Sequence, residues 1–257
     1  MLRQENYAEN TITAYIYAVK VFYTRYSEPT KQNLLAYKSE LIESFKPRTA
    51  NLRIHALNKY LTWIGKANLR LQSIKIQEDS FADNVISNED YTYLRRCLRE
   101  EPDKKWYFAV RYMAATGARV SELIQIKVEH VRAGYLDIYS KGGKVRRLYI
   151  PKQLRDETLN WLDRDSGYLF LNRYGKRLTT RGVASRLAFY ARKYGINPAV
   201  VHPHAFRHRF AKNFLEKQND LALLADLLGH ENIATTRIYL RKSSLEQRKL
   251  IDQIVDW

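Results

Sequence analysis

Six residues have the chemical types that transfer of a DNA phosphoryl group to a side chain requires. A tyrosine hydroxyl can act as the nucleophile, guanidinium and ammonium groups can bind the non-bridging oxygens, and an imidazole or ammonium can protonate the leaving 5′-oxygen. Such a reaction needs neither a metal ion nor an attacking water. The candidates, in chain order, are Arg119, Lys141, His204, Arg207, His230 and Tyr239.

Taken one at a time, these residues also have ordinary structural explanations. Tyr239 could be a packed aromatic residue, and Arg119 could be a surface arginine. Lys141 lies in a Gly-rich turn, where a solvated lysine is common. His230 could be part of a local helix cap. The chemical interpretation therefore depends on all six occurring together.

Two pairs of candidates share a helix by their spacing. His204 and Arg207 are three residues apart and would face the same way, so a proton-transfer group would lie beside a cation. Glu122 lies one turn after Arg119 and could orient the arginine by pairing with its guanidinium. We therefore expect Arg119 and Arg207 to bind phosphate.

The elements that carry these residues are predicted between residue 87 and the C-terminus. The spacing of apolar residues places Arg119 at the start of a helix after Gly117. It also places His230 just past the end of a helix that stops at Gly229. The segment that follows Gly229 is expected to be a short helix capped by Thr235 and Thr236, with Tyr239 one turn in. We predict helices over 87–100, 104–116, 152–162, 180–194, 204–217, 221–228 and 244–255, and strands over 135–140, 145–150 and 168–171.

The first part of the chain reads as a small all-helical unit. Its predicted helices cover 11–26, 30–44 and 48–64, and residues 69–77 alternate as an extended segment. The expected buried faces include Ile12, Ile16, Phe22, Leu34, Leu35, Leu41, Ile42, Ile54 and Leu57. The polar faces carry Lys20, Lys31, Lys38, Arg48, Arg53 and Lys59, which could bind DNA or simply be solvated.

These patterns predict a mainly α fold with a small antiparallel β-sheet. We expect a helical domain over 1–78, a linker over 79–86 and an α+β domain over 87–257. Lys141 would lie in the hairpin turn between the first two strands. The tail helix over 244–255 follows Tyr239 and could dock on a neighbouring subunit.

Composition indicates a nucleic-acid partner. The 257 residues include 44 Lys and Arg against 27 Asp and Glu, a formal charge of +17, and a chain this basic most plausibly binds a polyanion. The single cysteine, Cys97, excludes an internal disulfide and a multi-cysteine zinc site. No apolar run reaches membrane length and no signal-peptide core is present, so we expect a cytoplasmic protein without a membrane partner.

Four segments together resemble the tyrosine recombinase (phage integrase) family, most closely its short Xer-like members. They are "ATGARVSELIQI", "SKGGKVRRLYIP", "HPHAFRHRFA" and "LLGHENIATTRIYL", in the order and spacing of the family, and the resemblance covers nearly the whole chain. Two departures are small: His202 stands where Ser or Thr is common, and Leu240 and Arg241 follow the tyrosine where Thr and His often do.

The resemblance implies a role for each candidate. Arg119 and Arg207 would bind the phosphate, His204 would be an acid/base partner, His230 a transition-state hydrogen-bond donor and Tyr239 the nucleophile. Lys141, rather than Lys144, would be the general acid because the family prefers the first lysine of the turn.

The same resemblance implies the domains, the partners and the reaction. It indicates a helical core-binding (SAM-like) domain followed by a tyrosine recombinase catalytic domain. The enzyme would be a site-specific recombinase that joins double-stranded DNA through a 3′-phosphotyrosyl intermediate, in integration, excision or resolution. A homo-tetramer on paired sites would carry it out, without cofactor or metal. The alternatives are a type IB-like topoisomerase and a non-catalytic DNA-binding protein.

Overall fold

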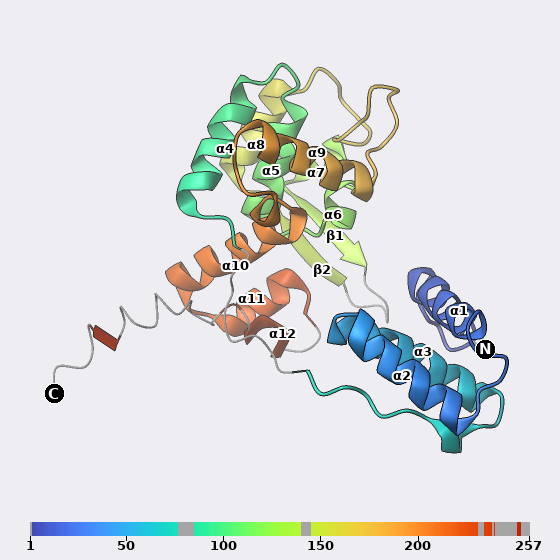
Figure 1. Ribbon diagram of the computed structural model, residues 1–257. Coiled ribbons are helices and arrows are strands. Elements are labelled where there is room, and N and C mark those ends of the chain that lie inside the picture. The colour runs from blue at the N-terminus through green and yellow to red at the C-terminus, as the bar shows by residue number, and fades with distance from the viewer. Residues whose placement is uncertain are drawn as a thin grey trace. The chain divides into compact units, whose positions relative to one another are not determined.

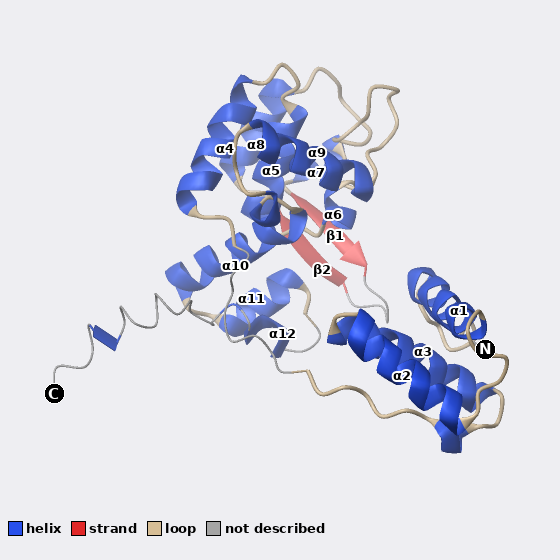
Figure 2. Cartoon of the chain, viewed as in Figure 1, coloured by secondary structure: helices blue, strands red, loops and turns tan. Residues whose placement is uncertain are grey.

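The computed structural model describes residues 2–76, 85–139, 145–230, 234–237, 239 and 251–252. The chain divides into two compact units, Met1–Asp79 and Ser80–Trp257. Helices predominate in both, and the two strands belong to the second unit (Figure 1, Figure 2). The mainly α fold with a small antiparallel sheet is therefore confirmed.

Three helices form the first unit: α1 (Glu9–Tyr23), α2 (Lys31–Ser44) and α3 (Pro47–Trp63), followed by the 3₁₀ turn η1 (Ala67–Leu69). Local signals set their starts. The Thr30 hydroxyl caps α2 by accepting from the Asn33 backbone N–H, and Pro47 occupies the first turn of α3. The core contains Phe22, Leu34, Tyr37, Leu41, Ile54, Leu57 and Leu61.

Two asparagines on α3 attach the extended segment that follows. The Asn51 amide donates to the Ile74 carbonyl at 2.9 Å and accepts from the Ile74 N–H at 2.8 Å. Asn58 does the same with Leu71, at 2.8 Å in both directions. Each side chain therefore satisfies one backbone donor and one backbone acceptor, as a neighbouring strand would.

Some residues predicted to be buried in the first unit are exposed. Leu35, Ile42 and Ile16 lie largely in solvent. In α2 the core contacts come from Leu34, Tyr37 and Leu41, which share one side of the helix. A residue one position further on is rotated by about 100° around the axis, so Leu35 and Ile42 leave the core face.

The second unit is built around α5 (Lys105–Thr116), which is buried along most of its length. Figure 1 shows other helices surrounding it on several sides. These elements are α4 (Asn88–Glu100), α6 (Val120–Leu123), α7 (Val128–Ala133), α8 (Lys152–Trp161), α9 (Thr180–Lys193), the 3₁₀ turn η2 (Pro198–Val200) and α10 (Pro203–Gln218). The Ser87 hydroxyl caps α4 by accepting from the Asp90 N–H at 2.9 Å.

The sheet pairs β1 (Tyr135–Tyr139) with β2 (Val145–Tyr149) in antiparallel register, Leu136 opposite Leu148 and Ile138 opposite Arg146. Alternation puts Arg146 and Leu148 on the inner face of β2, while Arg147 is more exposed. After the sheet and α10 the chain continues through α11 (Leu221–Leu228) and α12 (Ala234–Arg237).

The predicted strand over 168–171 is wrong. Tyr168 and Leu171 each form an isolated antiparallel bridge, with Lys127 and Arg177 respectively. Between them Leu169 donates its N–H to Ile126, while the Phe170 carbonyl accepts from Leu178. Because the backbone partner changes within these four residues, no continuous ladder forms in this segment.

Candidate active site

Arg119 lies at the N-terminal cap of α6, where Glu122 holds it. One Glu122 carboxylate oxygen accepts from the Arg119 backbone N–H at 2.7 Å, and the other accepts from Arg119 Nη1 at 3.0 Å. The Glu122 side chain is 7% exposed, but that of Arg119 is 40% exposed. The guanidinium can therefore still bind an anion from solvent while its orientation is fixed from behind.

The C-terminal end of α11 lies next to this arginine. Gly229 ends the helix in the left-handed conformation, at φ +63°, and His230 N–H bonds back to the Ala225 carbonyl. The last carbonyls of a helix have no partner within it, and they carry the negative end of its dipole. This helix end is therefore a binding site for cations.

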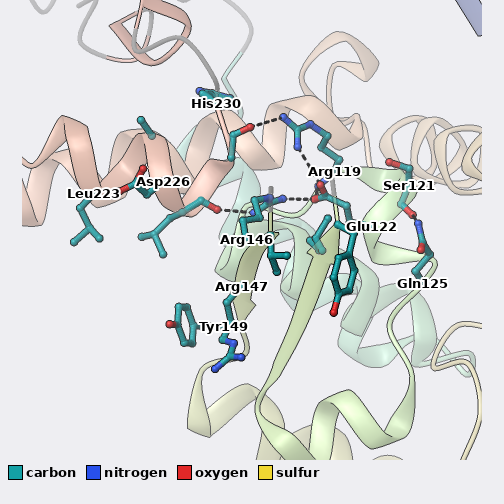
Figure 3. A pocket seen from close by; sticks show the side chains of 16 residues that line it. Arg119, Ser121, Glu122, Gln125, Arg146, Arg147, Tyr149, Leu223, Asp226 and His230 are labelled. Atoms are coloured by element: carbon teal, nitrogen blue, oxygen red, sulfur yellow. Dashed lines mark hydrogen bonds and ion pairs between the residues drawn. The ribbon is translucent and has the colours of Figure 1, made fainter. Parts of the chain in front are cut away.

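Three arginines from three different elements occupy it, and Figure 3 shows two of them, Arg119 and Arg146. Arg146 of β2 donates to the Leu227 carbonyl at 2.5 Å. Arg207 of α10 donates to the Leu228 carbonyl at 2.7 Å. Arg119 reaches the Gly229 carbonyl at 3.5 Å. Three consecutive carbonyls thus gather three guanidinium groups, two of which belong to the predicted site.

Arg207 is almost completely buried, with 4% of its surface exposed. It also donates to the Gly117 carbonyl at 2.8 Å. Gly117 has φ +65°, and a Cβ there would lie 2.6 Å from Phe210, so this tight turn requires glycine. Burial lowers the pKa of Arg207 to about 10, and repulsion by Arg119 adds to the shift. The guanidinium remains charged at neutral pH.

The structure brings Tyr239 to this cluster. Its ring lies 6.2 Å from the His230 ring in a stacked arrangement and 5.1 Å from the His208 ring in an edge contact. Burial raises the pKa of the Tyr239 phenol, while attraction to Arg207, hydrogen bonding to it and attraction to Arg119 act in the opposite direction. The hydroxyl is protonated at neutral pH, so its attack on a phosphate requires a proton acceptor.

His230 uses both ring nitrogens. Nε2 lies 2.9 Å from Arg207 Nη2, and Nδ1 lies 2.8 Å from the Thr236 hydroxyl. Burial lowers the pKa of His230 to about 4, with further lowering by Arg207 and other arginines. The ring is therefore neutral, accepting from Arg207 and donating to Thr236. To donate a hydrogen bond to a phosphate it would first have to exchange one of these partners.

The prediction that Thr235 and Thr236 cap a short helix with Tyr239 one turn in is wrong. Both threonines lie inside α12, and Tyr239 follows its end. Thr236 is fully buried and uses its hydroxyl to hold His230. The sequence contains a threonine at a plausible cap position, but its partner is set by a ring six residues earlier that only the folded chain brings close.

Placement differs for the two histidines near the start of α10. His204 lies exposed in the first turn and, among the described residues, makes no hydrogen bond or ring contact. His202 caps the helix, with Nδ1 accepting from the Ala205 N–H at 3.3 Å. A neutral imidazole here does what Ser or Thr would do, and burial keeps the pKa of His202 below its ordinary value.

Some predicted residues lie outside the described part of the chain. These are Lys141 with its hairpin turn, most of the linker over 79–86, and the tail helix over 244–255 apart from residues 251–252. Their predicted roles therefore stay predictions.

Sequence reasoning missed two residues at the site, Arg146 and His208. His208 is largely buried against Tyr239, and burial lowers its pKa to about 4, with His204 adding to the effect. For Arg146 a signal existed, because strand alternation places it on the same face as the apolar Leu148 and Ile150. A charged residue in that register is unusual and points to a specific partner.

A cavity of about 650 Å³ opens between β2, α6 and the end of α11. Arg119, Glu122, Arg146, Gly229 and His230 contribute to its lining (Figure 3). In the described ranges no three His, Cys, Asp or Glu side chains are grouped as a metal site, and no helix there is long and apolar enough to cross a bilayer.

Comparison with known proteins shows the family of this chain. The phage integrase family matches residues 84–246. Tyrosine recombinase XerA of Pyrococcus furiosus is 31% identical over 272 residues, covering 99% of this chain and 93% of that protein. Tyrosine recombinase XerC of Salmonella typhi is 33% identical over 209 residues, covering 75% of this chain and 69% of XerC.

A solved structure has a similar fold. The XerH site-specific recombinase bound to a palindromic difH substrate, in a post-cleavage complex, matches with a TM-score of 0.71 and 19% identity, over 96% of this chain and 79% of XerH. The sequence matches and the shared fold lead to one conclusion: this chain is a member of the phage integrase family, among its Xer-like tyrosine recombinases.

Proposed function

We propose that this chain is a site-specific DNA recombinase in which Tyr239 is the nucleophile. The observation that carries the proposal is the position of the Tyr239 ring beside His208 and His230, next to the buried Arg207 guanidinium. A phenol among cations and neutral imidazoles is suited to attack an anionic phosphate.

In the proposed reaction the Tyr239 oxygen forms a bond to the scissile phosphorus and the bond to the 5′-oxygen breaks. The phenol loses its proton and the leaving oxygen gains one, so the products are a 3′-phosphotyrosyl ester and a free 5′-hydroxyl. That hydroxyl then attacks the equivalent ester of a partner strand. One ester replaces another, so no external energy source is required.

The remaining candidates receive the roles that the family implies. Arg119 and Arg207 bind the non-bridging oxygens, as their positions at the end of α11 support. Lys141 protonates the leaving oxygen, His204 assists in proton transfer, and His230 donates a hydrogen bond after exchanging a partner. The exposure of His204 on α10 leaves its ring accessible to a bound duplex.

The first unit, with its exposed basic residues Lys20, Lys31 and Arg48, binds the same duplex, and four chains act on two sites. A two-site exchange assay, with the mass of the protein–DNA complex measured in solution, tests this assembly. A single chain sufficient for exchange would contradict it.

A capture experiment with duplexes of many sequences tests the chemistry and finds the DNA site at the same time. Nicked duplexes of randomised sequence are incubated with the protein, and DNA that remains attached under denaturing conditions is sequenced. We expect covalent capture of one related set of sequences by the wild-type chain and none by Tyr239→Phe. Capture by that variant would place the nucleophile elsewhere, and its absence with the wild-type chain would contradict the proposed function.

A further inference from the structure

Arg146 is the buried arginine at the site that has no role in the proposed reaction. Its side chain is 9% exposed. One end of the guanidinium donates to the Leu227 carbonyl, and the other pairs with Glu122. Its Nε is buried and has no partner among the described residues. Both ends of the guanidinium are therefore held within the protein, one of them by a carboxylate.

The cost of this arrangement shows that stability does not explain it. A buried ion pair is often no more stable than apolar residues of similar size, because both charges lose their hydration. An unpaired buried N–H adds a further penalty. The neighbours Leu148 and Ile150 show that an apolar residue suits this face of β2. The reason for an arginine at position 146 must therefore be the way it holds its neighbours in place.

The geometry gives that role. Glu122 is bonded to Arg119 twice and to Arg146 once, so its carboxylate links the two arginines. The other end of Arg146 fixes Leu227, one residue before the carbonyl that binds Arg207. Arg146 thus connects the sheet to both predicted phosphate-binding arginines, and Figure 3 shows the link to Arg119 through Glu122.

The packing of Gly229 against this side chain supports the same role. A Cβ at Gly229 would lie 2.3 Å from Arg146 Cδ and 2.7 Å from Nε. The arginine therefore lies directly on the backbone that leads to His230. Glu122 stays ionised in this environment: burial alone would raise its pKa, but attraction to Arg146 and bonds from Arg146 and Arg119 lower it overall.

We propose that Arg146 is a positioning residue, which acts through Glu122 and the end of α11 to hold Arg119 and Arg207 in the geometry that binds the scissile phosphate. The inference rests on the proposed function. It predicts a loss in the cleavage step and little loss in DNA binding, since Arg146 acts through Glu122 and the end of α11.

The test uses the full chain and a nicked duplex recovered in the capture experiment. Arg146→Lys retains a positive charge for Glu122 but has no fork to reach Leu227 at the same time. Arg146→Met removes the charge. Arg155→Met, on α8, is the control, because it also removes one arginine and one ion pair, that with Asp156.

The measurements are the rate of covalent adduct formation at saturating DNA, the Kd for the duplex, and Tm. We expect Arg146→Lys and Arg146→Met to slow adduct formation by about 10- to 10²-fold, because small misplacements of binding groups have effects of this size. Kd should change by less than about 3-fold. The control should match the wild-type chain in rate.

A double-mutant cycle separates positioning from folding. Glu122→Met combined with Arg146→Met removes both buried charges, so Tm should recover relative to either single change. The adduct rate should stay slow, and no slower than that of the slower single variant, because the two residues act as one unit.

The contrary results are distinct. A folded Arg146→Lys or Arg146→Met that forms adduct at the wild-type rate would overturn the inference, and so would a double variant whose rate loss is the product of the two single losses. A rate that recovers together with Tm in the double variant would also reject positioning. A wild-type chain that forms no adduct would instead reject the proposed function, and this inference with it.

Discussion

The two units bury polar groups of different kinds. In the first, the neutral amides of Asn51 and Asn58 bind the backbone of one extended segment. In the second, the neutral Thr116, Thr158 and Thr236 are buried together with groups that carry full charges, namely Arg207, Glu122 and Arg146. Amides lose little by leaving water once each donor and acceptor is paired, whereas ions lose much more.

This difference shows that the second unit, which carries the candidate active site, contains the less stable kind of buried polar group. The first unit uses its buried polar groups to fix the path of the chain. The second holds like charges next to one another: burial lowers the pKa of Arg207, and repulsion by Arg119 lowers it further. A site that binds an anion needs this excess of positive charge, and the carbonyls at the end of α11 partly offset it.

The largest expected effect is that of Tyr239→Phe. Removing the hydroxyl should abolish the covalent protein–DNA band on a denaturing gel, while DNA affinity stays within about 2-fold and Tm changes by only a few degrees. Tyr174→Phe, at an exposed tyrosine, is the control and should retain the band. If the Tyr239 variant lost DNA binding, the second unit would combine chemistry and binding in one residue.

Arg207→Lys should be next. A lysine cannot replace the bonds to both the Gly117 and the Leu228 carbonyls, so cleavage should slow by about 10²- to 10³-fold. The free energy of unfolding should fall by about 1–3 kcal/mol, because a buried acceptor loses its donor. Single-turnover adduct assays and urea unfolding measure the two effects. A cleavage rate within 10-fold of the wild-type rate would contradict the proposed binding of the phosphate by Arg207.

Two glycines allow the helix end to be tested separately from backbone strain. Gly229 and Gly195 both have positive φ, +63° and +68°, but a Cβ has open space at Gly195 and meets Arg146 at Gly229. Gly195→Ala should cost about 1–2 kcal/mol of stability and leave cleavage unchanged. Gly229→Ala should lower the free energy of unfolding by more than Gly195→Ala and should slow adduct formation by about 10-fold. Urea unfolding and single-turnover adduct assays measure the two effects. Equal effects would mean that the contact with Arg146 is unimportant.

The first unit should respond in the opposite way. Asn58→Ala leaves the Leu71 N–H and carbonyl without their partner, which should destabilise the unit by about 1–3 kcal/mol. Amide hydrogen exchange on the full chain should show the loss in residues 2–76, with the cleavage rate at saturating DNA within about 3-fold of wild type. Thr62→Ala, exposed on the same helix, is the control. A large rate loss would contradict the division between the units.

The smallest effect is a pH dependence of stability. The pKa values of His208 and His230 are both about 4 in the folded chain, below the ordinary 6.5, so the folded state binds fewer protons than the unfolded state between these values. Stability should therefore fall as pH drops from about 6.5 towards 4. His208→Phe should make the decline of Tm shallower, and the exposed His55→Gln should leave it unchanged. If Tm of His208→Phe declined with falling pH as steeply as that of the wild-type chain, other titratable groups would be responsible for the pH dependence.

Local signals account for most of what could be predicted. Thr30, Ser87 and Gly229 act on backbone groups within a few residues of themselves, so helix ends can be identified from the sequence. Helix faces are less certain, as Leu35 and Ile42 show, because the apolar stripe can be drawn through either of two adjacent positions.

Long-range contacts account for what could not be predicted. The candidates Arg119, Arg207, His230 and Tyr239 were found from the family pattern, and the structure brings them together. Arg146 depends on one carbonyl and one carboxylate from other elements, 81 and 24 residues away in sequence. No local pattern encodes such a pairing, apart from a charge at an inward strand position.

The run of three carbonyls that ends α11 also couples the three arginines to one another. Since each carbonyl accepts from a different guanidinium, a displacement of this short segment by about one hydrogen-bond length would break all three bonds together. Arg207 would keep its bond to Gly117, and Arg119 and Arg146 would keep theirs to Glu122.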